Sequence, residues 1–125
     1  MSHPHLIFVY GTLKRGLCRS HFLAGQLFLG AARTLSMYRM FNCGTYPGLT
    51  VHSDGLSILG ELWAVDASCL ARLDREEGVS DGLFGRYAIE MEGPVPECNS
   101  GDVIEAYFYL RTVAGFSDCG TVWID

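Results

Sequence analysis

The sequence has no long apolar run and no excess of positive charge. None of its apolar stretches approaches the roughly 18 residues that a membrane-spanning helix needs, so we expect no membrane partner. Nine Lys and Arg residues stand against fourteen Asp and Glu residues, and the net charge of -5 gives no electrostatic attraction for DNA or RNA. The composition therefore predicts neither a membrane protein nor a nucleic-acid-binding protein.

The N-terminal residues and the cysteines also lack recognisable signals. Residues 1–5 contain no cationic segment followed by an apolar stretch, which argues against a secretory signal and predicts a cytoplasmic location. The five cysteines are odd in number and widely spaced, and no C-x-x-C pair is present, which predicts thiols rather than disulfides. Because neither they nor the four histidines have the spacing of a metal site, no metal is expected.

Internal repeats, low-complexity tracts and linkers are absent as well. Hydrophobic residues make up 49% of the 125 residues, which is enough for one packed core. We therefore expect residues 1–125 to form a single domain.

Short β-rich segments dominate what is present. Residues 6–10 are predicted to form a buried first strand. Residues 26–41 are predicted to form one long bent strand, or two strands interrupted near Gly30. Residues 49–65 are interpreted as a hairpin because Ser53-Asp54-Gly55 is typical of a turn. Residues 87–91 and 103–110 complete the set of strands.

One helix is predicted over residues 67–77. Asp66 has the chemistry of an N-cap, Leu70 and Leu73 share a face, and Gly78 is typical of a C-terminal stop. Six or seven strands and one principal helix predict an α+β fold. Closure of the strands into a small mixed β-barrel would remove exposed edges and leave a mouth for a ligand.

Gly11, at the end of the first strand, is a candidate for a ligand contact. Its distance along the chain from Gly16 is that of a phosphate-binding loop, but Leu17 and Cys18 occupy the positions where that motif requires Lys and then Ser or Thr. Since Gly11 has no side chain, backbone N–H groups near it can approach a ligand closely. Taken alone, however, the segment favours a tight turn without a ligand.

Several carboxylates are candidates for proton transfer. Asp74, Glu76 and Glu77 gather at the end of the predicted helix, where the helix dipole raises carboxylate pKa values. Solvated surface positions are the more common role for such residues. Glu61 shares a strand face with Trp63, which is best explained by an edge position or an ion pair with an arginine. No Ser or Cys lies in a nucleophile elbow, so covalent catalysis has no support.

Four segments together resemble the gamma-glutamylcyclotransferase-like family, which includes gamma-glutamylamine cyclotransferase, YtfP-like and AIG2-like proteins. They are residues 8–16 (FVYGTLKRG), 46–48 (YPG), 60–66 (GELWAVD) and 73–78 (LDREEG). The resemblance extends over residues 6–110 and implies a small β-barrel with flanking helices.

The resemblance also implies roles for particular residues. It makes Glu77 the catalytic acid and base, and it places Tyr109 in the pocket, with a core position as the alternative. The residues that it implies for substrate binding are Tyr10, Gly11, Thr12 and Leu13. Family members often carry Tyr-x-Arg after the glutamate, whereas this chain has Phe84-Gly85-Arg86 and so lacks that phenol.

The activity implied by the resemblance is conversion of a gamma-glutamyl amine or small gamma-glutamyl peptide into 5-oxoproline and a free amine. The substrate's own α-amine supplies the nucleophile. One carboxylate and a few backbone N–H donors then suffice, without a metal or an organic cofactor. The alternative is a non-catalytic module that binds a small amino-acid-like ligand on the same fold. The sequence indicates neither the leaving amine nor the oligomeric state.

Overall fold

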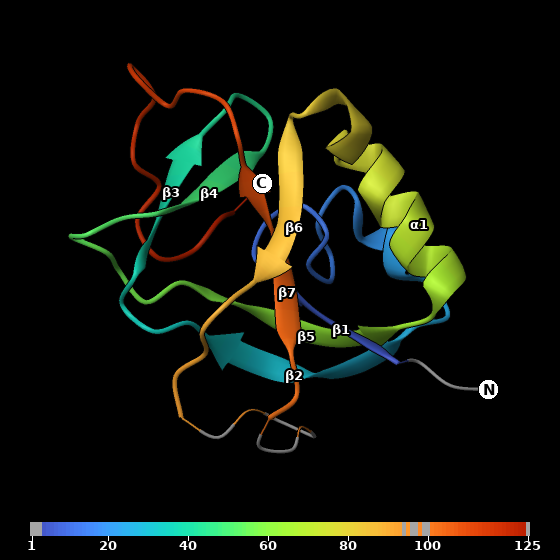
Figure 1. Ribbon diagram of the computed structural model, residues 1–125. Helices are drawn as coiled ribbons and strands as arrows, with labels where there is room; N and C mark the ends of the chain where they lie inside the picture. The colour runs from blue at the N-terminus through green and yellow to red at the C-terminus, as the bar shows by residue number, and fades with distance from the viewer. Residues whose placement is uncertain (1–3, 94, 96–97, 99–100, 125) are drawn as a thin grey trace.

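A computed structural model describes residues 4–93, 95, 98 and 101–124 of the chain, and within them seven strands form one mixed sheet (Figure 1). The strands are β1 (His5–Val9), β2 (Leu27–Arg33), β3 (Tyr38–Asn42), β4 (Pro47–Val51), β5 (Leu59–Val65), β6 (Phe84–Ala88) and β7 (Ile104–Tyr109). The helices are α1 (Ala67–Glu76) and the 3-10 turns η1 (Ser20–Leu23) and η2 (Val79–Asp81). No helix in the described part of the chain is both long enough and apolar enough to cross a membrane.

The strands follow the order β2-β5-β1-β7-β4-β3, and β6 pairs with β7 outside this path. β7 is therefore the centre of the sheet, with β1 and β4 parallel to it and β6 antiparallel. The predicted α+β class, with seven strands and one principal helix, is confirmed. The barrel description is approximate, because among the described residues the ladders do not close into a ring.

The hairpin predicted over residues 49–65 is wrong. β4 pairs with β3 and β7, whereas β5 pairs with β1 and β2, so the two expected arms lie in different parts of the sheet. Gly55 packs directly on the backbone of the segment before β3, where a Cβ would lie 2.3 Å from the Met37 carbonyl carbon. This close contact draws the chain after the turn toward β3 before β5 begins.

Residues 26–41 form two strands, but the interruption is not near Gly30. β2 carries only a shift of register between Phe28 and Gly30, and the break falls at residues 34–37. At the break the buried Thr34 hydroxyl donates to Leu35 O at 2.7 Å and accepts from Ile58 N at 2.9 Å. Because Thr34 satisfies these backbone groups itself, the chain can leave the β2 ladder there.

Side chains alternate along β1 and β7 and divide the core between the two faces of the sheet. Ile7, Val9 and Tyr107 belong to a cluster that includes Leu70 and Leu73 of α1. The opposite cluster contains Phe8, Tyr10, Met40, Leu49, Leu62, Ala106 and Phe108. Figure 1 shows α1 on one side of the sheet and the chain after β7 beside β3 and β4.

Tyr10 links three strands at the end of β1. Its hydroxyl donates to Tyr107 O on β7 at 2.6 Å and accepts from Leu49 N on β4 at 3.3 Å. Burial raises the pKa of the Tyr10 phenol well above its ordinary value, so the phenol remains a proton donor at neutral pH.

We expect Tyr10→Phe to lower the free energy of unfolding by about 1–3 kcal/mol, because buried backbone groups of Tyr107 and Leu49 lose a partner. Urea denaturation measures this loss. Tyr87→Phe is the matched control, since the Tyr87 side chain is 56% exposed. Equal effects of the two substitutions would contradict the linking role of Tyr10.

Candidate active site

Local sequence signals place Glu77 at the end of α1. Asp66 begins the helix, because its Oδ1 accepts a hydrogen bond from Cys69 N at 2.8 Å. At the other end Glu77 N donates to Leu73 O at 2.9 Å, and Gly78 takes the left-handed conformation with φ of 67°. The helix predicted over residues 67–77 is thus confirmed, with Glu77 as its C-cap.

Glu77 lies in the wall of a cavity at the end of β1. The other wall residues come from β1 and the turn after it, from the loop before β4 and the first residue of β4, and from β6 and β7. They are Phe8, Val9, Tyr10, Gly11, Thr12, Leu13, Tyr46, Pro47, Phe84 and Tyr107. The fold therefore brings the glutamate to the same cavity as the turn at Gly11, although the two are far apart in the sequence.

The environment of the Glu77 carboxylate favours its protonated form. The side chain is only 16% exposed, and burial raises the pKa of Glu77 from 4.5 to about 7. The guanidinium of Arg19, 4.0 Å away, partly opposes this rise, whereas the neighbouring charge of Glu76 adds to it. Loss of hydration is thus the main cause of the raised pKa.

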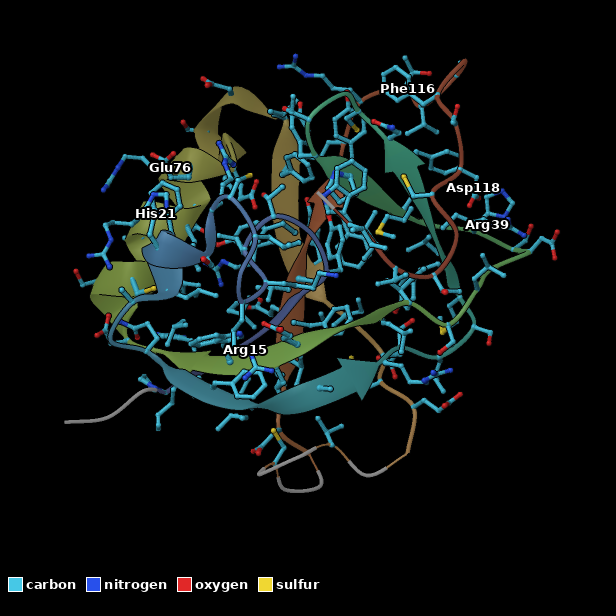
Figure 2. All side chains as sticks on the ribbon, turned by 180° about the vertical axis from the view of Figure 1, so that it is seen from behind. Arg15, His21, Arg39, Glu76, Phe116 and Asp118 are labelled. Carbon is cyan, nitrogen blue, oxygen red and sulfur yellow. The ribbon has the colours of Figure 1, made fainter. Side chains whose placement is uncertain are left out.

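The other two carboxylates at this helix end have different surroundings. Asp74 accepts from Arg86 Nε at 2.9 Å, from Arg86 Nη2 at 3.1 Å and from the Tyr107 hydroxyl at 2.6 Å. Burial alone would raise the pKa of Asp74, but these hydrogen bonds outweigh it and hold the pKa below its ordinary value. Glu76 is exposed and projects from α1 on the side where His21 lies (Figure 2). Glu77 is therefore the carboxylate of the three that lines the cavity.

Asp74 also fixes one wall of the cavity through Tyr107. Its hydrogen bond holds the Tyr107 phenol, whose pKa is raised by burial and by the neighbouring Asp74. Arg86, which binds Asp74, donates in addition to Glu105 Oε1 at 2.6 Å. α1, β6 and β7 are joined by these bonds directly behind the cavity.

Gly11 allows the turn after β1 to pack against the first residue of β4. A Cβ at Gly11 would lie 2.8 Å from Pro47 Cγ and 2.9 Å from Pro47 Cδ, closer than carbon atoms pack. The absence of a side chain therefore brings two cavity walls together.

The carbonyl and N–H groups of this turn differ in their hydrogen bonding. Gly11 O accepts from Lys14 N at 3.1 Å, and Thr12 O accepts from Arg19 N at 2.9 Å, so the turn is closed by its own carbonyls. The N–H groups of Gly11, Thr12 and Leu13 donate to no other group among the residues that the structure describes. These three donors belong to residues that line the cavity, which makes them candidates for contacts with a ligand.

Glu61 anchors the outer side of the turn through an ion pair with Arg15, which is one of the two explanations that the sequence favoured for this residue. Its carboxylate accepts from Arg15 N at 2.9 Å, from Arg15 Nε at 3.4 Å and from Trp63 Nε1 at 3.2 Å. The Arg15 guanidinium also lies over the Phe28 ring, 3.6 Å from its centre, on the β2 and β5 side of the molecule (Figure 2). These contacts hold the turn in place from outside the cavity.

The predicted substrate-binding residues differ in their placement. The four residues of the turn, Tyr10 to Leu13, all line the cavity. Tyr109 is not among the lining residues, and its ring packs edge to face on Phe84 at 5.4 Å. Phe84 itself lines the cavity, so the position where the family often has a tyrosine lies at the wall.

Five wall residues, including Phe8 and Val9 of β1, and one neighbouring cation were not predicted. Tyr46 and Pro47 belong to a segment that resembles the family, but no role was inferred for them. Tyr107 is two residues before Tyr109 on β7. Because alternate side chains of a strand share a face, the placing of Tyr109 in the pocket could have suggested Tyr107 as a wall residue as well. Arg19 had no sequence signal, because its approach to Glu77 depends on the tertiary fold.

The fold and the site define a small α+β protein in which a mostly buried carboxylate shares a cavity with the turn after the first strand. A family model described as gamma-glutamyl cyclotransferase, AIG2-like, matches residues 7–120. The match covers most of the chain, and the protein therefore belongs to the gamma-glutamylcyclotransferase, AIG2-like family.

Individual relatives agree with this assignment. A Vibrio cholerae protein that is provisionally named a gamma-glutamylcyclotransferase is 40% identical over 75 residues, which are 60% of this chain and 64% of that protein. Gamma-glutamylaminecyclotransferase A of Danio rerio is 36% identical over 111 residues, covering 82% of this chain and 66% of its own length. The chain thus spans just under two thirds of each relative.

A solved structure shows the same fold. YtfP of Escherichia coli superposes with a TM-score of 0.68 at 27% identity, over 94% of each chain. The sheet and the principal helix described above are therefore the family's architecture.

The raised pKa of Glu77 predicts a pH-dependent penalty on stability. Between pH 4.5 and about 7 the folded protein binds more protons at this group than the unfolded chain does, so stability falls as the pH rises through that range. Glu77→Gln should therefore have nearly the wild-type free energy of unfolding at pH 4.5 and exceed it by about 3 kcal/mol at pH 8.

Urea denaturation at the two pH values measures the difference. Glu76→Gln is the control, because it removes one negative charge from the exposed neighbouring position. It should show no comparable gain in the free energy of unfolding at pH 8. A gain for Glu77→Gln that is the same at both pH values would contradict the burial of an ionisable carboxylate.

The contact between Gly11 and Pro47 predicts non-additive substitutions. Gly11→Ala should lower the free energy of unfolding by about 1–3 kcal/mol, because its methyl group meets the Pro47 ring. Replacing that ring in the double variant Gly11→Ala, Pro47→Ala should recover part of this loss. Additive effects of the two single substitutions, measured by urea denaturation, would show that the walls do not meet here.

Proposed function

We propose that the protein is a cyclotransferase that converts a gamma-glutamyl amine or a small gamma-glutamyl peptide into 5-oxoproline and a free amine. Membership of the gamma-glutamylcyclotransferase family supports the reaction class. The observation that carries the assignment to a site is the mostly buried Glu77 carboxylate, which shares one cavity with the turn after β1. We infer a small gamma-glutamyl substrate as partner and a cytoplasmic location.

The reaction needs a proton carrier rather than a protein nucleophile. The substrate's α-ammonium must lose a proton before its nitrogen attacks the side-chain amide carbonyl and closes a five-membered ring. Glu77 accepts this proton in the proposal and returns it to the nitrogen of the leaving amine as the amide bond breaks. The ring nitrogen then loses a second proton to become the lactam N–H, and this proton passes through Glu77 to the released amine, which leaves as an ammonium ion. A pKa of about 7 suits both transfers at neutral pH, since both forms of the carboxyl group are then populated.

The turn after β1 supplies the second half of the chemistry. Attack on the carbonyl carbon places negative charge on the carbonyl oxygen. The N–H groups of Gly11, Thr12 and Leu13 are candidates to stabilise that charge, because they are fixed before the substrate arrives and need no rearrangement.

Substrate entry requires a movement of the cavity wall. The cavity is partly open to solvent, and its inner volume of about 30 Å³ accommodates no more than a water molecule or two. Tyr46 is a half-buried wall residue on the loop before β4, whereas Tyr107 and Phe84 are buried. We infer that the Tyr46 side of the wall opens to admit the glutamyl group.

The direct test is release of 5-oxoproline from a panel of gamma-glutamyl amines, amino acids and small peptides. Wild-type protein should form 5-oxoproline from at least one member of the panel. Glu77→Gln should lower kcat by about 10²- to 10⁴-fold, because the variant keeps the shape of the side chain and loses the proton carrier.

Glu76→Gln provides the matched control, since it removes the same charge from an exposed neighbouring position and should stay within a few-fold of wild type. An inactive wild type, or a Glu77→Gln variant at full rate, overturns the proposal. Binding of gamma-glutamyl compounds without turnover would instead identify a non-catalytic binding module.

A further inference from the structure

Arg19 is a cation next to the candidate catalytic carboxylate. Its backbone N–H donates to Thr12 O at 2.9 Å, so the residue is fastened to the turn that lines the cavity. Its Nη1 lies 4.0 Å from Glu77 Oε2, and 36% of its side chain is exposed. One residue thus connects the substrate-binding turn, the carboxylate and solvent.

The pairing of Arg19 with Glu77 leaves the guanidinium available for another anion. At 4.0 Å the two groups attract each other by charge but are too far apart for a hydrogen bond. Within the part of the chain that the structure describes, the Arg19 side chain donates no hydrogen bond. A guanidinium has five N–H donors in a planar fork that matches a carboxylate.

The two other cations of this turn are held elsewhere. Lys14 Nζ donates to Trp123 O at 2.8 Å. Arg15 binds Glu61 and lies over Phe28, on the outer side of the turn. Arg19 lies 4.0 Å from Glu77, beside the residues that line the cavity, and is therefore the cation of this turn that we consider for contact with a substrate.

We propose that Arg19 binds the α-carboxylate of the substrate's glutamyl group and thereby selects gamma-glutamyl compounds in which this carboxylate is free. The inference rests on the proposed function. In any such compound the α-ammonium and the α-carboxylate are attached to the same carbon atom. A substrate whose ammonium faces Glu77 therefore brings its carboxylate next to that carboxyl group, which is where Arg19 lies.

Arg19 acts in this scheme as a specificity residue and takes no part in the bonds that form and break. The anionic Glu77 and the cationic Arg19 together complement the charged head of an amino acid. Because the Arg19 backbone is hydrogen-bonded to Thr12 O, a contact between Arg19 and the α-carboxylate would also align the glutamyl chain with the backbone donors of the turn. Two parallel N–H donors of the Arg19 guanidinium would orient the α-carboxylate, and this would direct the α-amine toward the side-chain amide carbonyl that it attacks.

The experiment compares two matched substrates. One is a panel compound that the wild type converts, and the other is the same compound with its α-carboxylate changed to a carboxamide. We expect the ratio of kcat/KM for acid over amide to fall by about 10- to 100-fold in Arg19→Gln, mainly through KM of the acid. Any effect of the substitution on Glu77 itself acts on both substrates and cancels in the ratio.

Three further variants sharpen the result. Arg75→Gln removes the same charge from an exposed position on α1 and should leave the ratio unchanged. Arg19→Lys keeps the charge but loses the planar fork, and it should recover part of the selectivity. Arg111→Gln tests the other cation near the cavity. The Arg111 side chain donates to Asp81 O at 3.3 Å. Burial raises the pKa of the wall residue Tyr46, and the charge of Arg111 slightly opposes that rise, so Arg111 is close enough to be an alternative partner of the substrate carboxylate.

Binding of the product provides a second measurement that is independent of turnover. 5-Oxoproline retains the α-carboxylate, so Arg19→Gln should weaken its binding in calorimetry without affecting binding of the corresponding carboxamide.

The two proposals fail in different ways. If the wild type converts no member of the panel, the proposed function fails and the inference about Arg19 fails with it. If the wild type is active but Arg19→Gln keeps the selectivity for the acid, or if Arg111→Gln is the variant that loses it, the inference is wrong while the proposed function stands.

Discussion

The site depends on the burial of the Glu77 carboxylate at the C-terminal end of a helix. Two conditions there disfavour its charge: the lost hydration of a side chain that is only 16% exposed, and the negative end of the helix dipole. Arg19 offsets part of this cost at a distance of 4.0 Å. The fold tolerates the arrangement because Leu70 and Leu73 anchor the same helix in the core. A buried group that destabilises the protein when charged is typical of a position retained for chemistry.

The turn after β1 and the Tyr107 side of the cavity wall are held in place by separate contacts. Gly11 permits a close approach to Pro47, Glu61 binds the turn from outside, and Asp74 holds the Tyr107 phenol. None of these contacts changes the charge of Glu77 directly. Together they hold the turn after β1 and Tyr107 around the cavity that Glu77 also lines. In the proposed reaction this arrangement supplies the backbone donors and the proton carrier that an intramolecular ring closure requires.

Features that are set by neighbouring residues were predictable from the sequence. Asp66 and Gly78 mark the start and end of α1 through capping chemistry. These caps involve only residues close in the sequence, so the helix could be predicted without knowing the strand order. The pairing of residues 49–65 was not predictable in this way. Turn chemistry at Ser53-Asp54-Gly55 is local, whereas the partners of β4 and β5 are chosen by packing against strands distant in the sequence.

The same distinction applies to the site. Spacing alone did not separate Asp74, Glu76 and Glu77, and their burial in the folded protein does. Resemblance to the family singled out Glu77 and the turn, both of which line the cavity. It offered no signal for Arg19, because that contact arises only when the turn after β1 meets the end of α1.

The central claim is that the glutamyl group of a substrate lies between the turn at Gly11 and the Glu77 carboxylate. A crystal structure of the protein with 5-oxoproline tests it most directly. The account predicts the ring carbonyl oxygen within hydrogen-bond distance of the N–H groups of residues 11–13, and the ring N–H directed at Glu77. A ligand bound elsewhere, with this cavity unchanged, would contradict the account.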